Sequence, residues 1–336
     1  MEKCKLCKNK DADQTGSHLI SHLLLSRVDN VDKKKGRDLE LGFAINATET
    51  TAYFGRSILT EKLEEVFNIE SLDFDNLEKY KSPFIINHIF CSDCENRFSK
   101  IESSYSKSVN HNKITTLDIS FLFWISIFWR ASFKLPLDLM DGHKEFIRIL
   151  LNKYLPDTQG KYSSAILEDD RLKKVSFKIL RSTGFSGVKP TYISCHPQSQ
   201  NPYILLVDEF LILLSFKDKY NDCKKYKVDF EDNVTNASSN FIFKKIGINE
   251  ILTEVSEEIF ETINMFFLKK LTHKKSKHYK DFFDALEIKL NRRIPTNLRK
   301  EILEDMKSKK EGEKDTRQSL NKSTFKILSD KWQIYE

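Results

Sequence analysis

The chain has 336 residues, of which 40% are hydrophobic and 31% are charged, and its net charge is +6. This balance is typical of a folded globular protein and excludes a wholly disordered chain. Ten glycines and seven prolines are few for this length, which argues against a sandwich of many strands joined by tight hairpins. Neither GxGxxG nor GxxxxGK[ST] occurs, so the sequence lacks the glycine loops that cradle nucleotide phosphates.

The N-terminus and the cysteine content indicate the compartment. The first residues, MEKCKLCKNK, are charged and polar, unlike a secretory signal peptide. Six cysteines are too few for a secreted disulfide framework in a chain of this length. The longest apolar run, Ile119–Trp129, has 11 residues, whereas a membrane span needs about 20. We therefore expect a cytoplasmic protein without a membrane partner, in which paired cysteines hold metal.

The predicted elements begin with a cysteine pair in residues 1–28. Residues 29–82 form an insert, in which GFAINATETTAYF predicts one or two strands and SILTEKLEEVF predicts a helix. Residues 83–110 hold a second cysteine pair that leads into a polar helix. Residues 116–134 and 142–155 predict two further helices, and the first of them is apolar on most faces, which indicates burial.

Strand signals dominate the next part of the chain. Within 160–246, KKVSFKIL alternates apolar and polar residues, and YILLVDEFLILLSF has two apolar runs around Asp208-Glu209 that predict a hairpin. Residues 248–271 return to a helical period. Further helices follow to about residue 310, with a break at Arg293-Ile294-Pro295.

The positive charge is concentrated in the C-terminal fifth. From Leu268 to Glu336 there are 19 Lys and Arg against 11 Asp and Glu. Such a segment can follow a phosphate backbone, although solvated helix faces explain the same pattern. The candidate nucleic-acid-binding residues are the lysines that cluster behind an amphipathic helix: Lys269, Lys270, Lys274, Lys275 and Lys277.

Four of the six cysteines form two CxxC pairs, Cys4-Lys-Leu-Cys7 and Cys91-Ser-Asp-Cys94. A CxxC places both thiolates on one metal because the backbone turns between them, and two such pairs supply the four ligands of a tetrahedral Zn²⁺ site. Two chance pairs are the alternative. A redox role is disfavoured because neither pair lies at the strand-to-helix turn of a βαβ unit.

The residues around the pairs sharpen this interpretation. Ser17-His18-Leu19-Ile20 follows the first pair, Asn87 precedes the second, and Glu95-Asn96-Arg97 follows it on a predicted helix. This order resembles the zinc-stapled HNH endonucleases, which are built on a ββα treble-clef finger. Over about residues 1–105 and with Trp129-Arg130-Ala131-Ser132 downstream, the chain is also similar to a group of bacterial proteins of undefined function.

The resemblance implies a mechanism. His18 would be the base that deprotonates water, and Glu95 or Asn96 would hold a catalytic Mg²⁺ or Mn²⁺ from the helix, with Asn87 orienting the loop. The sequence departs from the family pattern at the residue before the base, where Ser17 replaces an acid or imidazole, and at the helix start, where Glu95 replaces His or Asn. A structural or nucleic-acid-binding finger without catalysis therefore stays open.

The sequence thus predicts an α+β protein with an N-terminal zinc-bound ββα, treble-clef or HNH-like finger and a following domain of helices and antiparallel sheet. The expected domains are 1–110, with the insert at 29–82, and 111–336, with the basic helical part at its C-terminus. We expect a metal-dependent endonuclease that binds DNA and forms a homo-oligomer or takes an activating protein partner. Arg130 is expected to pair with a buried carboxylate, and Glu102 to be a solvated charge.

Overall fold

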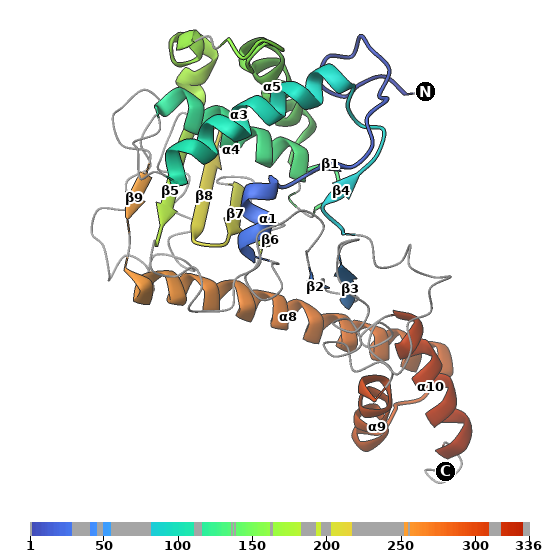
Figure 1. Ribbon diagram of the computed structural model, residues 1–336. Coiled ribbons are helices and arrows are strands. Elements are labelled where there is room, and N and C mark those ends of the chain that lie inside the picture. Colours follow the sequence, from blue (N-terminus) through green and yellow to red (C-terminus); the bar gives the residue numbers. More distant parts are fainter. Residues whose placement is uncertain are drawn as a thin grey trace. The chain divides into compact units, whose positions relative to one another are not determined.

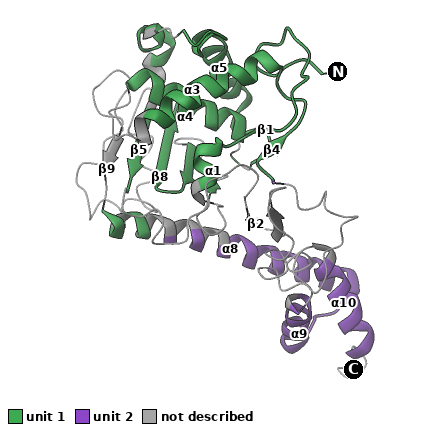
Figure 2. Cartoon of the chain, in the orientation of Figure 1, with its two compact units in different colours: residues 1–33, 83–264 green, residues 34–82, 265–336 purple. Residues whose placement is uncertain are grey.

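The structure is a computed structural model. It describes residues 2–28, 41–45, 50–54, 82–110, 116–135, 137, 139–161, 164–182, 193–195, 203–216, 252–254, 256–308 and 317–331. The predicted helix SILTEKLEEVF, most of the linker KSKKEGEKDTRQ and Cys223 lie outside these residues. The chain divides into two compact units, 1–33 with 83–264 and 34–82 with 265–336 (Figure 2). The domain boundary expected between residues 110 and 111 lies within the first unit, at the end of helix α3 (Ser92–Asn110).

The first unit combines short strands, helices and one larger sheet (Figure 1). Its elements are β1 (Ser17–His18), α1 (His22–Val28), β4 (Ile85–Ile86), α3 (Ser92–Asn110), α4 (Leu117–Ala131), α5 (Asp141–Tyr154), η3 (Ser164–Glu168), η4 (Asp170–Lys174), β5 (Ser176–Arg181), β6 (Ile193–Cys195), β7 (Tyr203–Val207), β8 (Phe210–Ser215), β9 (Leu252–Glu254) and the first residues of α8 (Glu257–Leu290). This mixture of helices and mainly antiparallel strands confirms the predicted α+β class.

The larger sheet has the strand order β6-β7-β8-β5-β9. The predicted hairpin is confirmed, because β7 and β8 pair antiparallel with Val207 opposite Phe210 across a two-residue turn. The alternation of KKVSFKIL is confirmed as β5, which pairs antiparallel with β8. The helix predicted from residue 248 is wrong at its start. Residues Leu252–Glu254 form β9, which pairs parallel with β5, so pairing with the sheet overrides the helical period there.

Helix α4 is the centre of the core of this unit. Every residue from Ser120 to Ala131 is buried, as its apolar composition predicts. Phe121 packs edge-on against Phe177 of β5, and the ring centroids of Trp124 and of Phe210 on β8 are 5.3 Å apart. On another side of α4, helix α3 contributes Tyr105, whose hydroxyl accepts a 2.9 Å hydrogen bond from Trp124. Helix α4 therefore joins the sheet to the helix that carries the second cysteine pair.

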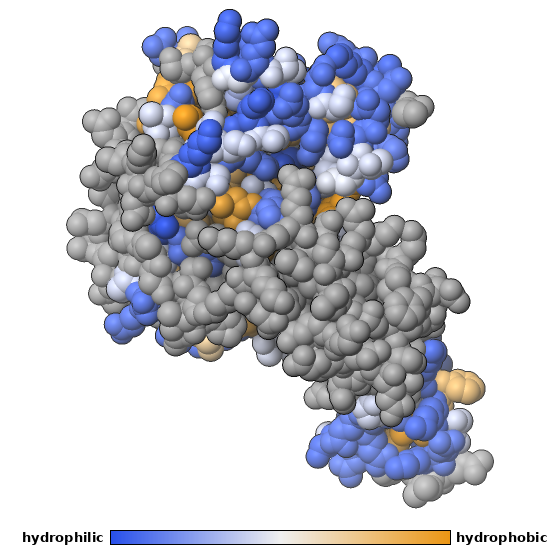
Figure 3. Space-filling view, in the orientation of Figure 1, coloured by the Kyte–Doolittle hydropathy of each residue, from blue (hydrophilic) through white to orange (hydrophobic). Residues whose placement is uncertain are grey.

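The second unit is described mainly through its helices. It contains a hairpin of β2 (Leu41–Ile45) and β3 (Thr50–Phe54), most of α8, and the helices α9 (Thr296–Lys307) and α10 (Arg317–Lys331). The break between α8 and α9 confirms the one predicted at Arg293-Ile294-Pro295. A small apolar core joins the three helices through Phe283, Ile294, Leu298, Ile302, Met306, Leu320 and Ile327. In the face that Figure 3 shows, the described residues of α9 and α10 are largely hydrophilic.

Candidate metal centre

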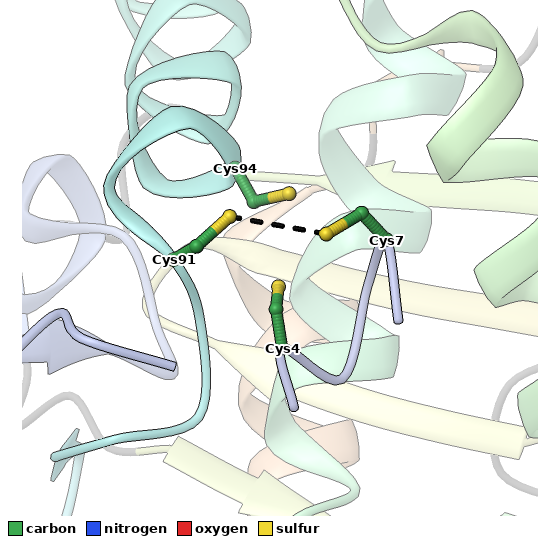
Figure 4. A group of neighbouring side chains, drawn as sticks. All are labelled: Cys4, Cys7, Cys91 and Cys94. Carbon is green, nitrogen blue, oxygen red and sulfur yellow. Dashed lines mark hydrogen bonds between the residues drawn. The ribbon is translucent and has the colours of Figure 1, made fainter. Parts of the chain in front are cut away.

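The two cysteine pairs, far apart in sequence, come together at the N-terminal end of helix α3. The sulfur atoms of Cys4, Cys7, Cys91 and Cys94 all lie within 4.8 Å of one another, and those of Cys7 and Cys91 are 3.9 Å apart (Figure 4). Sulfurs about 2.3 Å from a tetrahedral Zn²⁺ are about 3.8 Å apart. The cluster therefore has the donors and spacing to hold a metal ion such as zinc.

Local backbone structure places each pair. The first pair sits on a tight turn, in which the Lys8 amide donates to the Cys4 carbonyl at 2.9 Å and Lys8 has a φ of 61°. The second pair lies on the first turn of α3, where the Glu95 amide donates to the Cys91 carbonyl. The Lys5 amide donates to the Ile89 carbonyl and so ties the turn to the segment between β4 and α3. Three of the cysteines are buried, and Cys7 is half-buried.

The thiols cannot all ionise without a cation. A hydrogen bond from Cys94 lowers the pKa of Cys4 to about 4, whereas the same interaction raises the pKa of Cys94. Burial raises the pKa of Cys91. The cluster by itself thus favours one thiolate supported by neighbouring thiols. A bound divalent cation supplies the charge that lets all four ionise.

Helix α5 braces the first turn. Arg148 donates to the Leu6 carbonyl at 2.7 Å, and Lys8 forms an ion pair with Glu145 at 3.1 Å. On the second pair, Lys10 pairs with Asp93. These contacts could not be predicted from the sequence, because the two residues of each contact are far apart along the chain and no regular spacing relates them.

A polar site adjoins the cysteines on β1. Strand β1 pairs antiparallel with β4, with Ser17 opposite Ile86 and His18 opposite Ile85. The Ser17 hydroxyl is buried and donates to Glu95 at 2.9 Å. Burial raises the pKa of Glu95, against the opposing effects of Arg130 and the Ser17 hydrogen bond. Ser17, the residue before the candidate base His18, therefore contacts Glu95, the first residue after Cys94 on α3.

The other predicted site residues are distributed around this pair. His18 is half-buried, and its ring centroid lies 6.2 Å from that of His22. Asn87 accepts a 2.8 Å hydrogen bond from the Gly16 amide, so its side chain links the residue after β4 to the residue before β1. Gly16 has a φ of 73° there, which a residue with a side chain adopts only with strain. Asn96 is exposed on α3.

The predicted pairing of Arg130 with a carboxylate is confirmed, although that carboxylate, Glu102, is half-buried instead of buried, and the prediction that Glu102 is a solvated charge is wrong. The Arg130 guanidinium is 1% exposed and contacts Glu102 at 2.5 Å, so Glu102 is an ion-pair partner instead of a solvated charge. A second nitrogen of Arg130 donates to the His18 carbonyl at 2.9 Å. The Trp-Arg-Ala-Ser segment therefore reaches the candidate site directly, since its Arg130 bonds the main chain of the candidate base.

The candidate nucleic-acid-binding lysines all lie on α8. The structure describes four of their side chains, and that of Lys270 lies outside the described residues. Of the four, Lys269 and Lys277 are exposed, and Lys274 and Lys275 are half-buried. No described helix is long and apolar enough to cross a membrane.

Comparisons with known proteins return no match: no protein-family model, no curated protein and no solved structure is significantly similar to this chain. Within the described part of the chain, the four cysteines are the one group of three or more His, Cys, Asp or Glu side chains placed to share a metal ion. The site must therefore be interpreted from its own geometry.

Proposed function

We propose that Cys4, Cys7, Cys91 and Cys94 hold one structural Zn²⁺, and that β1, β4 and α3 form a treble-clef-like ββα finger around it. A turn that presents two thiolates and a helix N-terminus that presents two more form a closed four-sulfur set, which is the donor set of structural zinc. Such a site leaves no position for water. The zinc therefore holds the N-terminal turn against α3, and any chemistry belongs to the residues on β1.

We further propose that this finger carries an HNH-like endonuclease site that hydrolyses DNA. The observation that carries this proposal is the 2.9 Å hydrogen bond between Ser17 and Glu95. The HNH resemblance implies a metal held between the residue before the base and a residue on the helix. Ser17 and Glu95 occupy these two positions, and His18 follows Ser17 on β1.

Each group then has a role. The His18 imidazole takes a proton from water, for which a group that titrates near neutral pH is suited. The resulting hydroxide forms a new P–O bond, one ester P–O bond breaks, and the leaving oxygen takes a proton from solvent. The Glu95 carboxylate and the Ser17 hydroxyl are oxygen donors for Mg²⁺ or Mn²⁺, which, when bound, offsets negative charge on the phosphate. Asn96 follows Glu95 on α3 and is exposed, and it is the alternative helix ligand for the ion.

A second candidate function is a zinc finger that binds nucleic acid or protein without cleaving. The identity of residue 17 favours it, because a serine hydroxyl is a weaker metal ligand than a carboxylate or an imidazole. DNA is the proposed partner in the first function, and nucleic acid or a protein is the proposed partner in the second.

Plasmid nicking separates the two functions. Zinc-loaded protein with Mg²⁺ or Mn²⁺ should nick supercoiled DNA, and His18→Ala should abolish nicking while zinc content and melting temperature stay unchanged. His273→Ala, which removes an exposed imidazole from α8, is the matched control and should nick like the wild type. Zinc-loaded wild type that nicks with neither ion would support the binding module. Nicking that survives His18→Ala would exclude His18 as the base.

A further inference from the structure

Arg130, the penultimate residue of α4, is a buried charged side chain that bonds the main chain of β1. Its side chain is 1% exposed, so it cannot touch a DNA phosphate directly. One terminal nitrogen donates to the His18 carbonyl at 2.9 Å, and the other contacts Glu102 of α3 at 2.5 Å. Its guanidinium carbon lies 4.8 Å from the centre of the Phe98 ring. The guanidinium is therefore held on three sides, by β1, by a carboxylate and by an aromatic ring.

These contacts fix the main chain of one particular residue. Strand β1 has two residues, Ser17 and His18, and within the described residues its one partner strand is β4. A two-residue strand contributes few ladder hydrogen bonds, so β1 by itself is weakly held. The bond from Arg130 to the His18 carbonyl adds an anchor from the buried core helix. The Arg130 charge also acts on Glu95, which Ser17 contacts from the same strand.

We infer that Arg130 is a positioning residue that holds His18 in place through its main-chain carbonyl. This inference rests on the proposed function, in which His18 is the base. The planar guanidinium suits the task because its fork donates in two fixed directions at once, to the His18 carbonyl and to Glu102. A lysine keeps the charge but is a single point donor on a flexible stem. Arg130→Lys therefore keeps the Glu102 ion pair and removes the fixed anchor on β1.

The matched control is Arg97→Lys. Arg97 also donates to main-chain carbonyls, at Leu155 and Pro156 beyond the end of α5, with distances of 3.0 Å to each. It lies on the same helix as Glu102 and, among the described residues, bonds α5 and its C-terminal end instead of β1. Both variants remove a guanidinium that bonds the backbone. A general effect of such a change should appear in both, and an effect on His18 should appear only in Arg130→Lys.

Two measurements on zinc-loaded full-length protein test the inference. The first is the NMR signals of the His18 ring, assigned with His18→Ala: they should shift in Arg130→Lys and stay in place in Arg97→Lys. The second is nicking of plasmid with Mg²⁺, in which Arg130→Lys should lower kcat roughly 10- to 100-fold with little change in KM, because a small displacement of a catalytic group has an effect of this size. Glu102→Gln weakens the ion pair that fixes Arg130. It should shift the His18 signals and lower kcat as Arg130→Lys does, but by smaller amounts.

The outcomes are distinguishable. His18 signals that do not move in Arg130→Lys would overturn the inference, whatever the activity. Loss of zinc and of cooperative unfolding in both Arg130→Lys and Glu102→Gln would also overturn it, by making Arg130 a purely structural residue. If the His18 signals shift in Arg130→Lys and the wild type does not nick DNA, Arg130 is shown to position His18 and the proposed nuclease function is contradicted.

Discussion

Trp129→Ala should destabilise the metal centre from a distance, because the finger and the core helix share one aromatic cluster. Trp129 of α4 is 1% exposed. Its ring centroid lies 5.7 Å from Phe90 and 6.3 Å from Phe98, the aromatic residues that flank the second cysteine pair. It lies 4.8 Å from Phe133 as well. These separations are those of favourable aromatic pairs. The substitution therefore removes the packing between α4 and the segment that carries Cys91 and Cys94.

The expected loss of stability in Trp129→Ala is set by the burial of the tryptophan and is reduced by its unpaired indole nitrogen. Truncating a buried tryptophan to alanine costs about 3–5 kcal/mol. Among the described residues, the Trp129 indole nitrogen is buried without a hydrogen-bond partner, and such a group costs about 1–3 kcal/mol in the native protein. We therefore expect the low end of the range, about 3 kcal/mol, or more than about a 100-fold change in the unfolding equilibrium of this unit. Trp129→Phe, which removes the unpaired donor and keeps an aromatic ring, should be milder.

The assay is zinc release during urea unfolding, followed with a chromogenic chelator. Zinc release reports on the unit that holds the cysteines, whereas a global probe would mix two units that can unfold separately. Release should occur at lower urea in Trp129→Ala. Phe325→Ala is the control, since Phe325 of α10 is 78% exposed and its truncation should change stability by less than about 0.5 kcal/mol. A shift below about 1 kcal/mol in Trp129→Ala would show that the finger and α4 fold independently.

Two other predictions concern charge. Replacing the α8 lysine cluster by glutamine should weaken DNA binding equally for all sequences and leave zinc content unchanged. The plot of log binding constant against log salt concentration should become shallower by about 0.9 for each phosphate no longer neutralised. Superimposable binding curves would exclude DNA binding by these lysines. Hydrogen bonds from Arg171 and Tyr154 hold the pKa of Asp169 below its usual value, so its contribution to stability is present above the unfolded pKa of about 3.9 and disappears as pH falls below it. Asp169→Asn should therefore be less stable than wild type at pH 7, by roughly 1.5–3 kcal/mol, and urea unfolding should show this gap closing in acid; a gap that does not depend on pH would contradict the assignment.

The elements with strong periodicity were predictable from the sequence. Helix α4 is buried, as its largely apolar composition indicates, and the hairpin turn falls at Asp208-Glu209 between the two apolar runs. Helix α3 begins at the second cysteine pair, as predicted. In each case the signal is local, because one short stretch of sequence determines both the element and its buried face.

What escaped prediction depends on interactions between distant residues. Strand β9 exists because the edge of β5 is available for pairing, and nothing in its own three residues shows this. Glu102 pairs with Arg130, which is 28 positions away. The sequence close to Glu102 is therefore typical of a solvent-exposed helix and gives no sign of the ion pair. The four cysteines were grouped correctly because metal ligands of one type carry a spacing signal even when their pairs are far apart. Hydrogen bonds such as that between Ser17 and Glu95 carry none.

The measurement that tests the central claim most directly is the zinc content of freshly purified full-length protein, combined with X-ray absorption at the zinc edge. The four-cysteine arrangement predicts one zinc per chain with four sulfur neighbours at about 2.3 Å, and loss of that zinc in Cys94→Ser. Zinc well below one per chain, or a first shell containing nitrogen or oxygen, would contradict the account.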